Sequence, residues 1–380
     1  MYYGVNLMEL LTLTQKLISQ KSISPNDGNC QQIIADLLLK HGFEIHKQDI
    51  ADTKNMLAIK GDADKPAIIL LGHTDVVPEG GAWQTEPFKA TIKNNTLYGR
   101  GAVDMKAAVA AMTLAATKFS TKKYKIAVML TSDEETSGQN GIAAAISAWL
   151  PILGEISACL VGEPTSKQVI GDTIKLGRRG SINAKLQVMG IQGHAAYPDL
   201  ADNAINNTAK IIELLSDIKF PSERKFPDTK ICCTGLNSSS NTCNIIPGSA
   251  EISFNIRYAP NIEPCAIKKT IEQALANSGI RTELITWQPG AKPYLSTGGF
   301  FTSALIASIE SCRQITPRIS FDGGTSDGRH LAQYCAEVVE FGARNAYAHK
   351  VDEQIKLSEL EQLLEIYSLA LANINMLENA

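Results

Sequence analysis

The sequence of 380 residues lacks a long apolar run, an excess of basic residues and a low-complexity segment. Its longest apolar stretches, such as Ala107 to Ala116, are shorter than the roughly 20 residues that a membrane-spanning helix needs. Lys and Arg number 36 against 39 Asp and Glu, so no basic field is present to bind nucleic acid or anionic lipid. We therefore expect neither a membrane nor a nucleic-acid partner, and favour a small molecule or a protein.

The sequence also lacks an export signal and a paired cysteine motif. Residues 1–20 contain no positively charged stretch before an apolar core and no small-residue cleavage site, and their apolar residues recur at helical spacing. The eight cysteines form no C-x-x-C motif. We expect a cytoplasmic protein with an N-terminal surface helix and with reduced cysteines that are mostly buried.

The length and the pattern of apolar residues predict two domains, one of them inserted into the other. Short apolar strands alternate with helical segments in the first part of the chain and again after the insert, which predicts an α/β fold with a mostly parallel mixed sheet. The segment between them alternates strands with two helices, which predicts a smaller α+β domain. The expected boundaries are 1–179 and 293–380 for the α/β domain and 180–292 for the insert.

Expected elements of the α/β domain are strands at 56–60, 67–71, 125–131, 158–161 and 338–341, and helices at 30–41, 105–119, 141–149 and 358–377. Those of the insert are strands at 181–189, 250–258 and 281–287, and helices at 203–216 and 265–277.

Three expected strands, ending at Leu71, Thr131 and Val161, run directly into polar residues. Ligands of open α/β sheets bind beyond the carboxyl ends of the strands, so these loops are the first candidates for a site. The first loop contains His73 and Asp75. Residues two apart on an extended chain face the same way, so Asp75 can orient the imidazole of His73 towards a metal. A simple hydrogen-bonded pair is the alternative.

The other loops add carboxylates. Asp104 precedes an Ala-rich helix, where it is either a metal ligand or a helix N-cap. Glu134 and Glu135 follow the second strand, and Glu163 follows the third; a solvated acidic loop is the alternative for the pair. His349 is one of only six histidines. Two imidazoles and three carboxylates, with Glu134 left over, match the ligands that two divalent cations need, with zinc favoured and cobalt or manganese as substitutes.

The chain resembles the M20 family of metallopeptidases and deacylases, and in particular its succinyl-diaminopimelate desuccinylases. The matching segments are SISPND (22–27), GHTDVVP (72–78), 98–106, 131–135, 161–164, GRRGS (177–181), GHAAYP (193–198), NIIPG (244–248), GGTSDGR (323–329) and HKVDE (349–353). The resemblance implies a zinc-exopeptidase-like catalytic domain with an inserted dimerisation, or lid, domain. It also implies hydrolysis of N-succinyl-LL-2,6-diaminopimelate to succinate and LL-2,6-diaminopimelate, in lysine biosynthesis.

The same resemblance implies roles for individual residues. His73, Asp104 and Glu163 would bind one zinc ion. Asp104 would bridge to a second zinc ion held by Glu135 and His349. Asp75 would orient His73, and Glu134 would act as the general base.

The resemblance also implies a homodimer. It implies that each subunit donates His194 and Asn244 across the interface to the site of its partner, where His194 would stabilise the oxyanion. A capped loop histidine is the alternative reading of His194. The substrate carries carboxylates, which favour guanidinium groups and a glycine-rich loop. The residues expected to bind it are Arg178, Ser181, Tyr197, Asn244, Arg257, Gly324, Thr325 and Asn345.

Three rival functions use the same features differently. Another M20-type deacylase, such as an acetylornithine deacetylase, an aminoacylase or a dipeptidase, would use the same metals with a different anion-binding set. A non-catalytic dimeric binding protein would be expected to lack Glu134 or a ligand, and none is lost. A two-metal phosphoesterase fits the matched motifs poorly.

Overall fold

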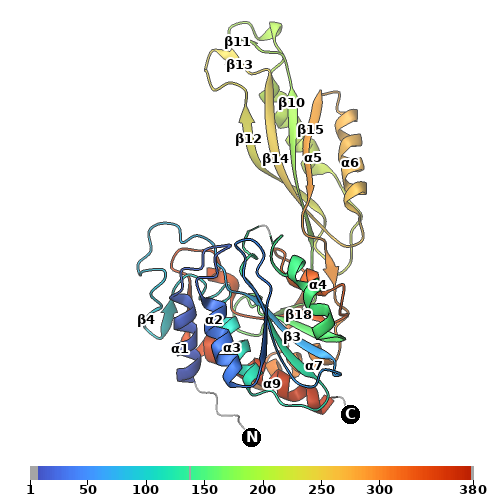
Figure 1. Cartoon of the computed structure of the whole chain (residues 1–380). Helices are drawn as coiled ribbons and strands as arrows, with labels where there is room; N and C mark the ends of the chain where they lie inside the picture. Colours follow the sequence, from blue (N-terminus) through green and yellow to red (C-terminus); the bar gives the residue numbers. More distant parts are fainter. Residues whose placement is uncertain (1–6, 137, 378–380) are drawn as a thin grey trace. The chain divides into compact units, whose positions relative to one another are not determined.

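The computed structural model describes residues 7–136 and 138–377. The chain divides into two compact units (Figure 1). Unit 1 comprises Met1–Gly177, Ser296–Ser320 and Ser326–Ala380, and unit 2 comprises Arg178–Leu295 and Phe321–Thr325. Unit 2 interrupts unit 1 along the chain. The sequence predicted an insert at 180–292; the contacts add the short segment 321–325, where the ring of Phe321 packs against Phe226 at 4.9 Å.

An eight-stranded mixed sheet forms the centre of unit 1, in the order β1-β2-β6-β3-β7-β18-β8-β17. The four adjacent strands β6, β3, β7 and β18 are parallel, whereas β1 with β2, β2 with β6, and β18 with β8 pair antiparallel. The strands are β1 (Glu44–Lys47), β2 (Asn55–Lys60), β3 (Ala67–His73), β6 (Lys125–Thr131), β7 (Ile156–Val161), β8 (Thr173–Lys175), β17 (Arg318–Ser320) and β18 (Val338–Glu340). The predicted α/β class, with a mostly parallel mixed sheet, is confirmed.

Helices cover this sheet because its central strands are apolar on both faces. All seven residues of β3 are buried, as expected for a parallel strand enclosed on two sides. The helices are α1 (Leu7–Ile18), α2 (Cys30–Lys40), α3 (Lys106–Thr117), α4 (Ile142–Leu153), α7 (Phe300–Arg313), α8 (Gly328–Leu331) and α9 (Leu357–Leu377). The Ala-rich helix α3 packs against β3 and β6 and against α1 and α9. Its small side chains permit this central position.

Two glycines let α3 approach the ends of the strands. A Cβ atom on Gly72, in β3, would lie 2.7 Å from Met105 Cε and 2.9 Å from Val109 Cγ2. A Cβ atom on Gly162, just after β7, would lie 2.6 Å from Met105 Cε and 2.7 Å from Met112 Cε. A Cβ atom at either position would therefore fit only if these neighbouring side chains moved. Each glycine directly precedes a predicted metal ligand, His73 or Glu163.

We expect Gly162→Ala to lower the free energy of unfolding by about 1–3 kcal/mol, because an added methyl group overpacks the contact with α3. Equilibrium urea unfolding, followed by circular dichroism, measures this change. Gly81→Ala is the matched control, since no atom of the described residues lies within 4 Å of a Cβ atom there. Equal stability of the two variants would contradict the packing argument.

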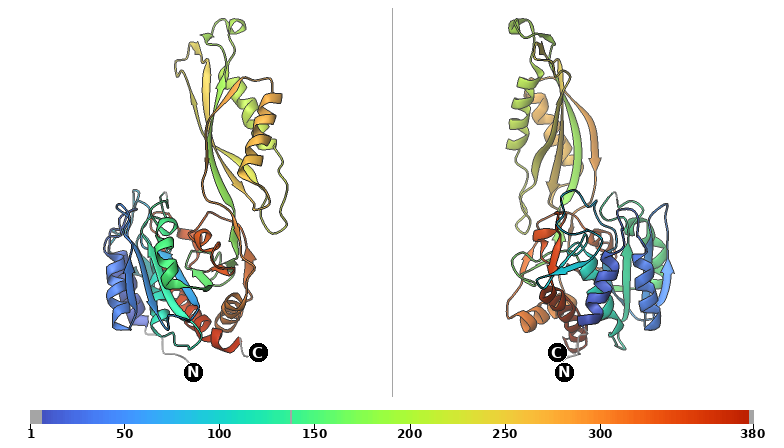
Figure 2. Two further views of the ribbon diagram at one scale, coloured as in Figure 1. Left: turned by 45° about the vertical axis from the view of Figure 1, so that its right-hand side comes forward. Right: turned by 90° about the vertical axis from the view of Figure 1, so that its left-hand side faces the viewer.

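Unit 2 is a four-stranded antiparallel sheet in the order β12-β14-β10-β15, with two helices on one face (Figure 2). Buried and partly exposed residues alternate along β14, so one face of the sheet supplies the core. Side chains from this face pack with α5 and α6 in one apolar cluster. The elements are β10 (Gly180–Met189), β12 (Lys230–Ser238), β14 (Ser249–Tyr258), β15 (Thr282–Pro289), α5 (Ala204–Asp217) and α6 (Pro264–Asn277). The edge strand β12 was not predicted, because most of its residues are exposed.

Short elements complete the chain. The three-stranded sheet β19-β5-β4 belongs to unit 1, and the β11–β13 pair belongs to unit 2. The bounds are β4 (Thr91–Lys93), β5 (Thr96–Tyr98), β9 (Gly177–Arg178), β11 (Gly193–His194), β13 (Ile245–Ile246), β16 (Tyr294–Leu295), β19 (Gln354–Lys356), and the 3-10 helices η1 (Pro198–Leu200) and η2 (Asn345–Tyr347). Among the described residues, no helix has the length and apolar character needed to span a membrane.

All eight cysteines are free thiols, as predicted. The expectation that most are buried is wrong: three are buried, two are intermediate and three are exposed. Two of the exposed ones, Cys232 and Cys265, lie on the edge strand β12 and the amphipathic helix α6 of unit 2. An edge strand and an amphipathic helix each leave one side in contact with solvent.

Candidate metal centre

Three neighbouring strands of unit 1 end where the predicted ligands begin. His73 is the last residue of β3, Glu163 follows the end of β7, and Glu134 and Glu135 follow the end of β6. Because β6, β3 and β7 are parallel and adjacent, their carboxyl ends meet at one edge of the sheet. Asp104 reaches the same edge from the loop that precedes α3.

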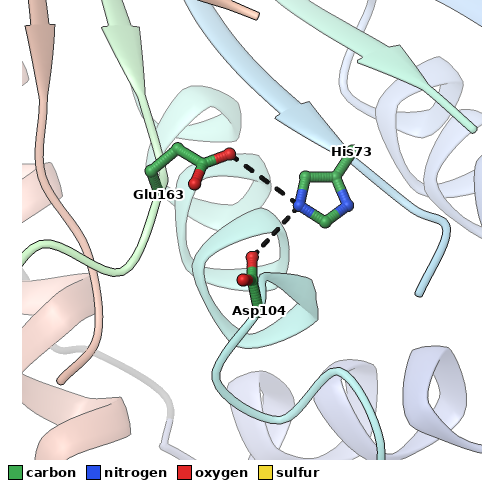
Figure 3. A group of neighbouring side chains, drawn as sticks. All are labelled: His73, Asp104 and Glu163. Carbon is green, nitrogen blue, oxygen red and sulfur yellow. Dashed lines mark hydrogen bonds and ion pairs between the residues drawn. The ribbon is translucent and has the colours of Figure 1, made fainter. Parts of the chain in front are cut away.

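His73, Asp104 and Glu163 converge in one group (Figure 3). His73 Nε2 lies 3.1 Å from Asp104 Oδ1 and 3.9 Å from Glu163 Oε1. All three side chains are largely buried. One imidazole nitrogen and two carboxylate oxygens thus face a common point, as the ligands of a divalent cation do.

A second group shares Asp104. His349 Nε2 lies 2.9 Å from Glu135 Oε1 and 3.3 Å from Asp104 Oδ2. Asp104 therefore directs one carboxylate oxygen towards each histidine, and so joins the two groups. The side chain of His349 is 52% exposed, so this part of the cluster is open to solvent.

The main chain orients His73. Its Nδ1 donates to the carbonyl oxygen of Asp75 at 2.9 Å, whereas the carboxylate Oδ1 of Asp75 is 3.6 Å away. The sequence had suggested the carboxylate for this task. With Nδ1 bonded to this carbonyl oxygen, Nε2 is the nitrogen that faces the cluster.

The Asp75 carboxylate instead holds the acidic loop. It accepts hydrogen bonds from the main-chain N–H groups of Glu135 at 3.1 Å and Glu134 at 3.4 Å. The hydroxyl of Ser24 donates to the same carboxylate. These bonds fix where the acidic pair leaves the end of β6.

Burial and mutual repulsion change the protonation of the cluster. Burial, followed by the charge of Glu163, raises the pKa of Glu134 well above its usual value. Burial lowers the pKa of His73, but the hydrogen bond and charge of Asp104 with the charge of Asp75 outweigh it, so the pKa lies well above the usual range. Hydrogen bonds to Asp104 and Glu135 raise the pKa of His349 to about 10. Carboxylates this close together repel one another, and a divalent cation can supply the positive charge that relieves this repulsion.

The residues expected to bind substrate carboxylates lie in both units. In unit 2, Arg178 Nη1 donates to the carbonyl oxygen of Gly324 at 3.2 Å, next to Thr325. Ser181 faces Arg257 across β10 and β14, and its hydroxyl accepts a hydrogen bond from Asn255 at 3.0 Å. In unit 1, Asn345 begins η2 and its N–H group donates to Ser166 O at 2.9 Å.

His194, Tyr197 and Asn244 gather at the small β11–β13 sheet of unit 2. The rings of His194 and Tyr197 are 5.7 Å apart, and His194 Nδ1 accepts a hydrogen bond from the N–H group of Ala196 at 3.0 Å. The carbonyl oxygen of Asn244 accepts one from Ala195 N–H at 3.0 Å. Both rings are exposed. Donation of His194 and Asn244 to a second subunit remains a prediction.

Two residues beside the cluster received no role from the sequence. Arg100 and Glu353 lie in the motifs GRGAVDMK and HKVDE, and in unit 1 they form a buried ion pair of 2.9 Å. The sequence could have pointed to a role for them, because both lie in matched motifs. Their contact, however, joins residues some 250 positions apart, and neither motif alone shows it.

Comparison with known proteins agrees with the predicted family. Residues 69–373 match the sequence profile described as Peptidase family M20/M25/M40. Two curated relatives, named succinyl-diaminopimelate desuccinylase, come from Nitrosomonas eutropha and Nitrosomonas europaea. They are 39% and 40% identical over 372 residues, which cover 96% of this chain and 98% of each relative.

Solved structures share the fold. An M20 family metallo-carboxypeptidase from Sulfolobus solfataricus superposes with a TM-score of 0.80 at 17% identity, covering 97% of this chain and 99% of the other. A dinuclear metal-binding M20 peptidase from Bacillus subtilis gives 0.70 at 16%, covering 97% and 98%. With the profile match over most of the sequence and relatives at 39% and 40% identity, these findings establish that the chain belongs to peptidase family M20/M25/M40.

Proposed function

We propose that this chain hydrolyses the amide bond of N-succinyl-LL-2,6-diaminopimelate, releasing succinate and LL-2,6-diaminopimelate for lysine biosynthesis. The desuccinylase name of relatives 39% and 40% identical along nearly the whole chain supports the substrate. The observation that carries the chemistry is Asp104, which lies between His73 and His349 with one oxygen directed to each.

Two zinc ions per subunit, with cobalt as a substitute, belong to the proposal. His73, Asp104 and Glu163 would hold one ion, and Asp104, Glu135 and His349 the other. Imidazole and carboxylate donors suit both metals. When bound, the ions would polarise the scissile carbonyl and lower the pKa of the attacking water.

Glu134 is the general base of this proposal. Its carboxylate takes a proton from water as the water oxygen attacks the amide carbon, and it returns the proton to the nitrogen as the C–N bond breaks. The buried surroundings of Glu134 raise its pKa, which favours holding a proton between these two steps. Asp75 contributes by fixing the main chain of Glu134 and Glu135.

The substrate carboxylates would be bound by guanidinium groups, because their planar donors match a carboxylate. We assign this role to Arg178 and Arg257. The polar groups of Ser181, Gly324 and Thr325 would complete the anion-binding set, together with Asn345 and Tyr197.

The proposed unit of function is a cytoplasmic homodimer. His194 and Asn244 would reach the site of the partner, where His194 would stabilise the oxyanion. Both belong to the small β11–β13 region, whose aromatic side chains are exposed and so available to a second subunit.

The function can be tested by following amide-bond loss from N-succinyl- and N-acetyl-diaminopimelate, with and without a chelator. We expect the succinyl substrate to be cleaved faster by at least about 10-fold, since losing a charge-assisted hydrogen bond costs roughly 1.5–3 kcal/mol. We expect the chelator to abolish cleavage, and stoichiometric zinc to restore it.

Equal rates on the two substrates would move the assignment to a deacylase of broader acyl specificity, such as an acetylornithine deacetylase. Cleavage that survives complete metal removal would reject the metal-dependent mechanism. Absence of cleavage, in the presence of bound zinc, would favour a non-catalytic binding protein.

A further inference from the structure

We propose that the buried ion pair of Arg100 and Glu353 is a positioning device that sets the distance between Asp104 and His349, and so controls metal affinity at the group formed by Asp104, Glu135 and His349. The inference rests on the proposed use of metal ions. Neither Arg100 nor Glu353 belongs to the groups proposed to hold the cations or the substrate, so the inference assigns them a positioning role rather than a catalytic one.

Glu353 holds the loop that presents Asp104. Its Oε1 accepts hydrogen bonds from Val103 N–H at 2.7 Å and Asp104 N–H at 3.0 Å. Its Oε2 accepts one from Gly101 N–H at 2.9 Å and one from Arg100 Nη1 at 2.9 Å. Both carboxylate oxygens are thus used, and one of the bonds ends on the main chain of Asp104 itself.

Glu353 also belongs to the segment that carries His349. Its own carbonyl oxygen accepts a hydrogen bond from Gly99 N–H at 2.9 Å. Arg100 Nη1 donates to the carbonyl oxygen of Lys350 at 3.0 Å, one residue after His349. The segments that carry Asp104 and His349 are therefore hydrogen-bonded to each other through both residues of this ion pair.

Arg100 connects a third segment. Its Nη2 donates to the carbonyl oxygens of Pro78 at 3.2 Å and Glu79 at 3.0 Å, a few residues after His73 and Asp75. The guanidinium group also lies 5.2 Å from the centre of the Trp83 ring. One side chain therefore bonds loops that lead to both histidines of the cluster.

The burial of this ion pair indicates a role other than stabilising the fold. The side chains of Arg100 and Glu353 are 2% and 1% exposed. Removing two charges from water costs several kcal/mol per ion, and such pairs are often no more stabilising than apolar residues of similar size. The cost is offset here by bonds that converge on the loops of the metal ligands. Outer partners of metal ligands commonly act in this way.

The test compares Glu353→Gln with Glu337→Gln. Glu337 is a matched control because it is also a buried carboxylate of unit 1 that accepts main-chain hydrogen bonds, from Phe301 and Thr302 at the start of α7. Zinc affinity and stoichiometry are measured on chelator-stripped, refilled protein by competition with a chromophoric chelator. The visible absorption of the cobalt-loaded protein reports the coordination geometry.

We expect Glu353→Gln to weaken binding of one of the two ions by about 10- to 100-fold, as loss of an outer partner does, and to change the cobalt spectrum. Glu337→Gln should lose thermal stability while keeping both affinities and the spectrum. Arg100→Lys keeps the charge but not the fork of donors, and should reproduce the selective loss.

If the wild-type protein binds two ions and every variant binds them with the wild-type affinities, this inference is overturned and the proposed function stays intact. Wild-type protein that binds no ion would overturn the proposed function itself. Loss of the folded state in both Glu353→Gln and Arg100→Lys would show that the pair is a general structural element, which also contradicts the inference.

Discussion

Replacing Glu134 by glutamine is expected to lower kcat by about 10²- to 10⁴-fold, the usual contribution of a positioned general base. Glutamine keeps the size of the side chain but cannot take a proton from water. KM should change far less than kcat, because Glu134 is not among the groups proposed to bind the substrate carboxylates. Steady-state rates of succinate release measure both constants.

The matched control is Glu361→Gln, at an exposed position of α9. Its kcat should equal that of the wild type. The zinc content of Glu134→Gln should also be unchanged: Glu134 does form a third possible group with His73 and Glu135, but it is outside the two groups joined by Asp104 that are proposed to hold the ions. A Glu134→Gln enzyme with full metal content and more than a tenth of the wild-type kcat would exclude Glu134 as the base.

Asp104→Asn is expected to weaken metal binding by more than the roughly 10- to 100-fold that loss of an outer partner costs, and to lower activity accordingly. The reason is geometric: Asp104 directs Oδ1 to His73 and Oδ2 to His349. Asparagine offers one oxygen, and its NH₂ group would face the other histidine's position. Zinc titration of the chelator-stripped protein measures the loss.

Asp172→Asn is the control for this variant. Asp172 is also an aspartate of unit 1 with several main-chain hydrogen bonds, from Lys167, Gln168 and Val169. Its replacement should leave zinc stoichiometry at the wild-type value. If Asp104→Asn binds two ions with wild-type affinity, Asp104 does not bridge them.

The cluster owes its position to the way α3 packs. Gly72 and Gly162 have no side chain, so the residues around Met105 can lie against the ends of β3 and β7. This contact brings the loop of Asp104 to His73 and Glu163, although the three residues are far apart along the chain. Packing and the candidate metal centre are coupled here, because Gly72 directly precedes His73 and Gly162 directly precedes Glu163.

Much of this arrangement could be predicted from short segments of sequence. Apolar runs that end in His73, in the acidic pair and near Glu163 already place these residues at strand ends, because the alternation of strands and helices predicts a parallel sheet. The inserted unit could be predicted for a similar reason, since its alternating strand β14 has one buried face. The short strands β8 and β17 and the edge strand β12 carried too few apolar residues for this.

Local sequence therefore determined which residue types stand at which strand ends, and thereby the family and the kind of site. Tertiary structure alone decided that Asp104 faces both histidines, that the main-chain oxygen of Asp75 orients His73, and that Arg100 reaches Glu353. These are contacts between distant segments, or choices between two acceptors on one residue. They depend on the packing of whole elements, which no single motif encodes.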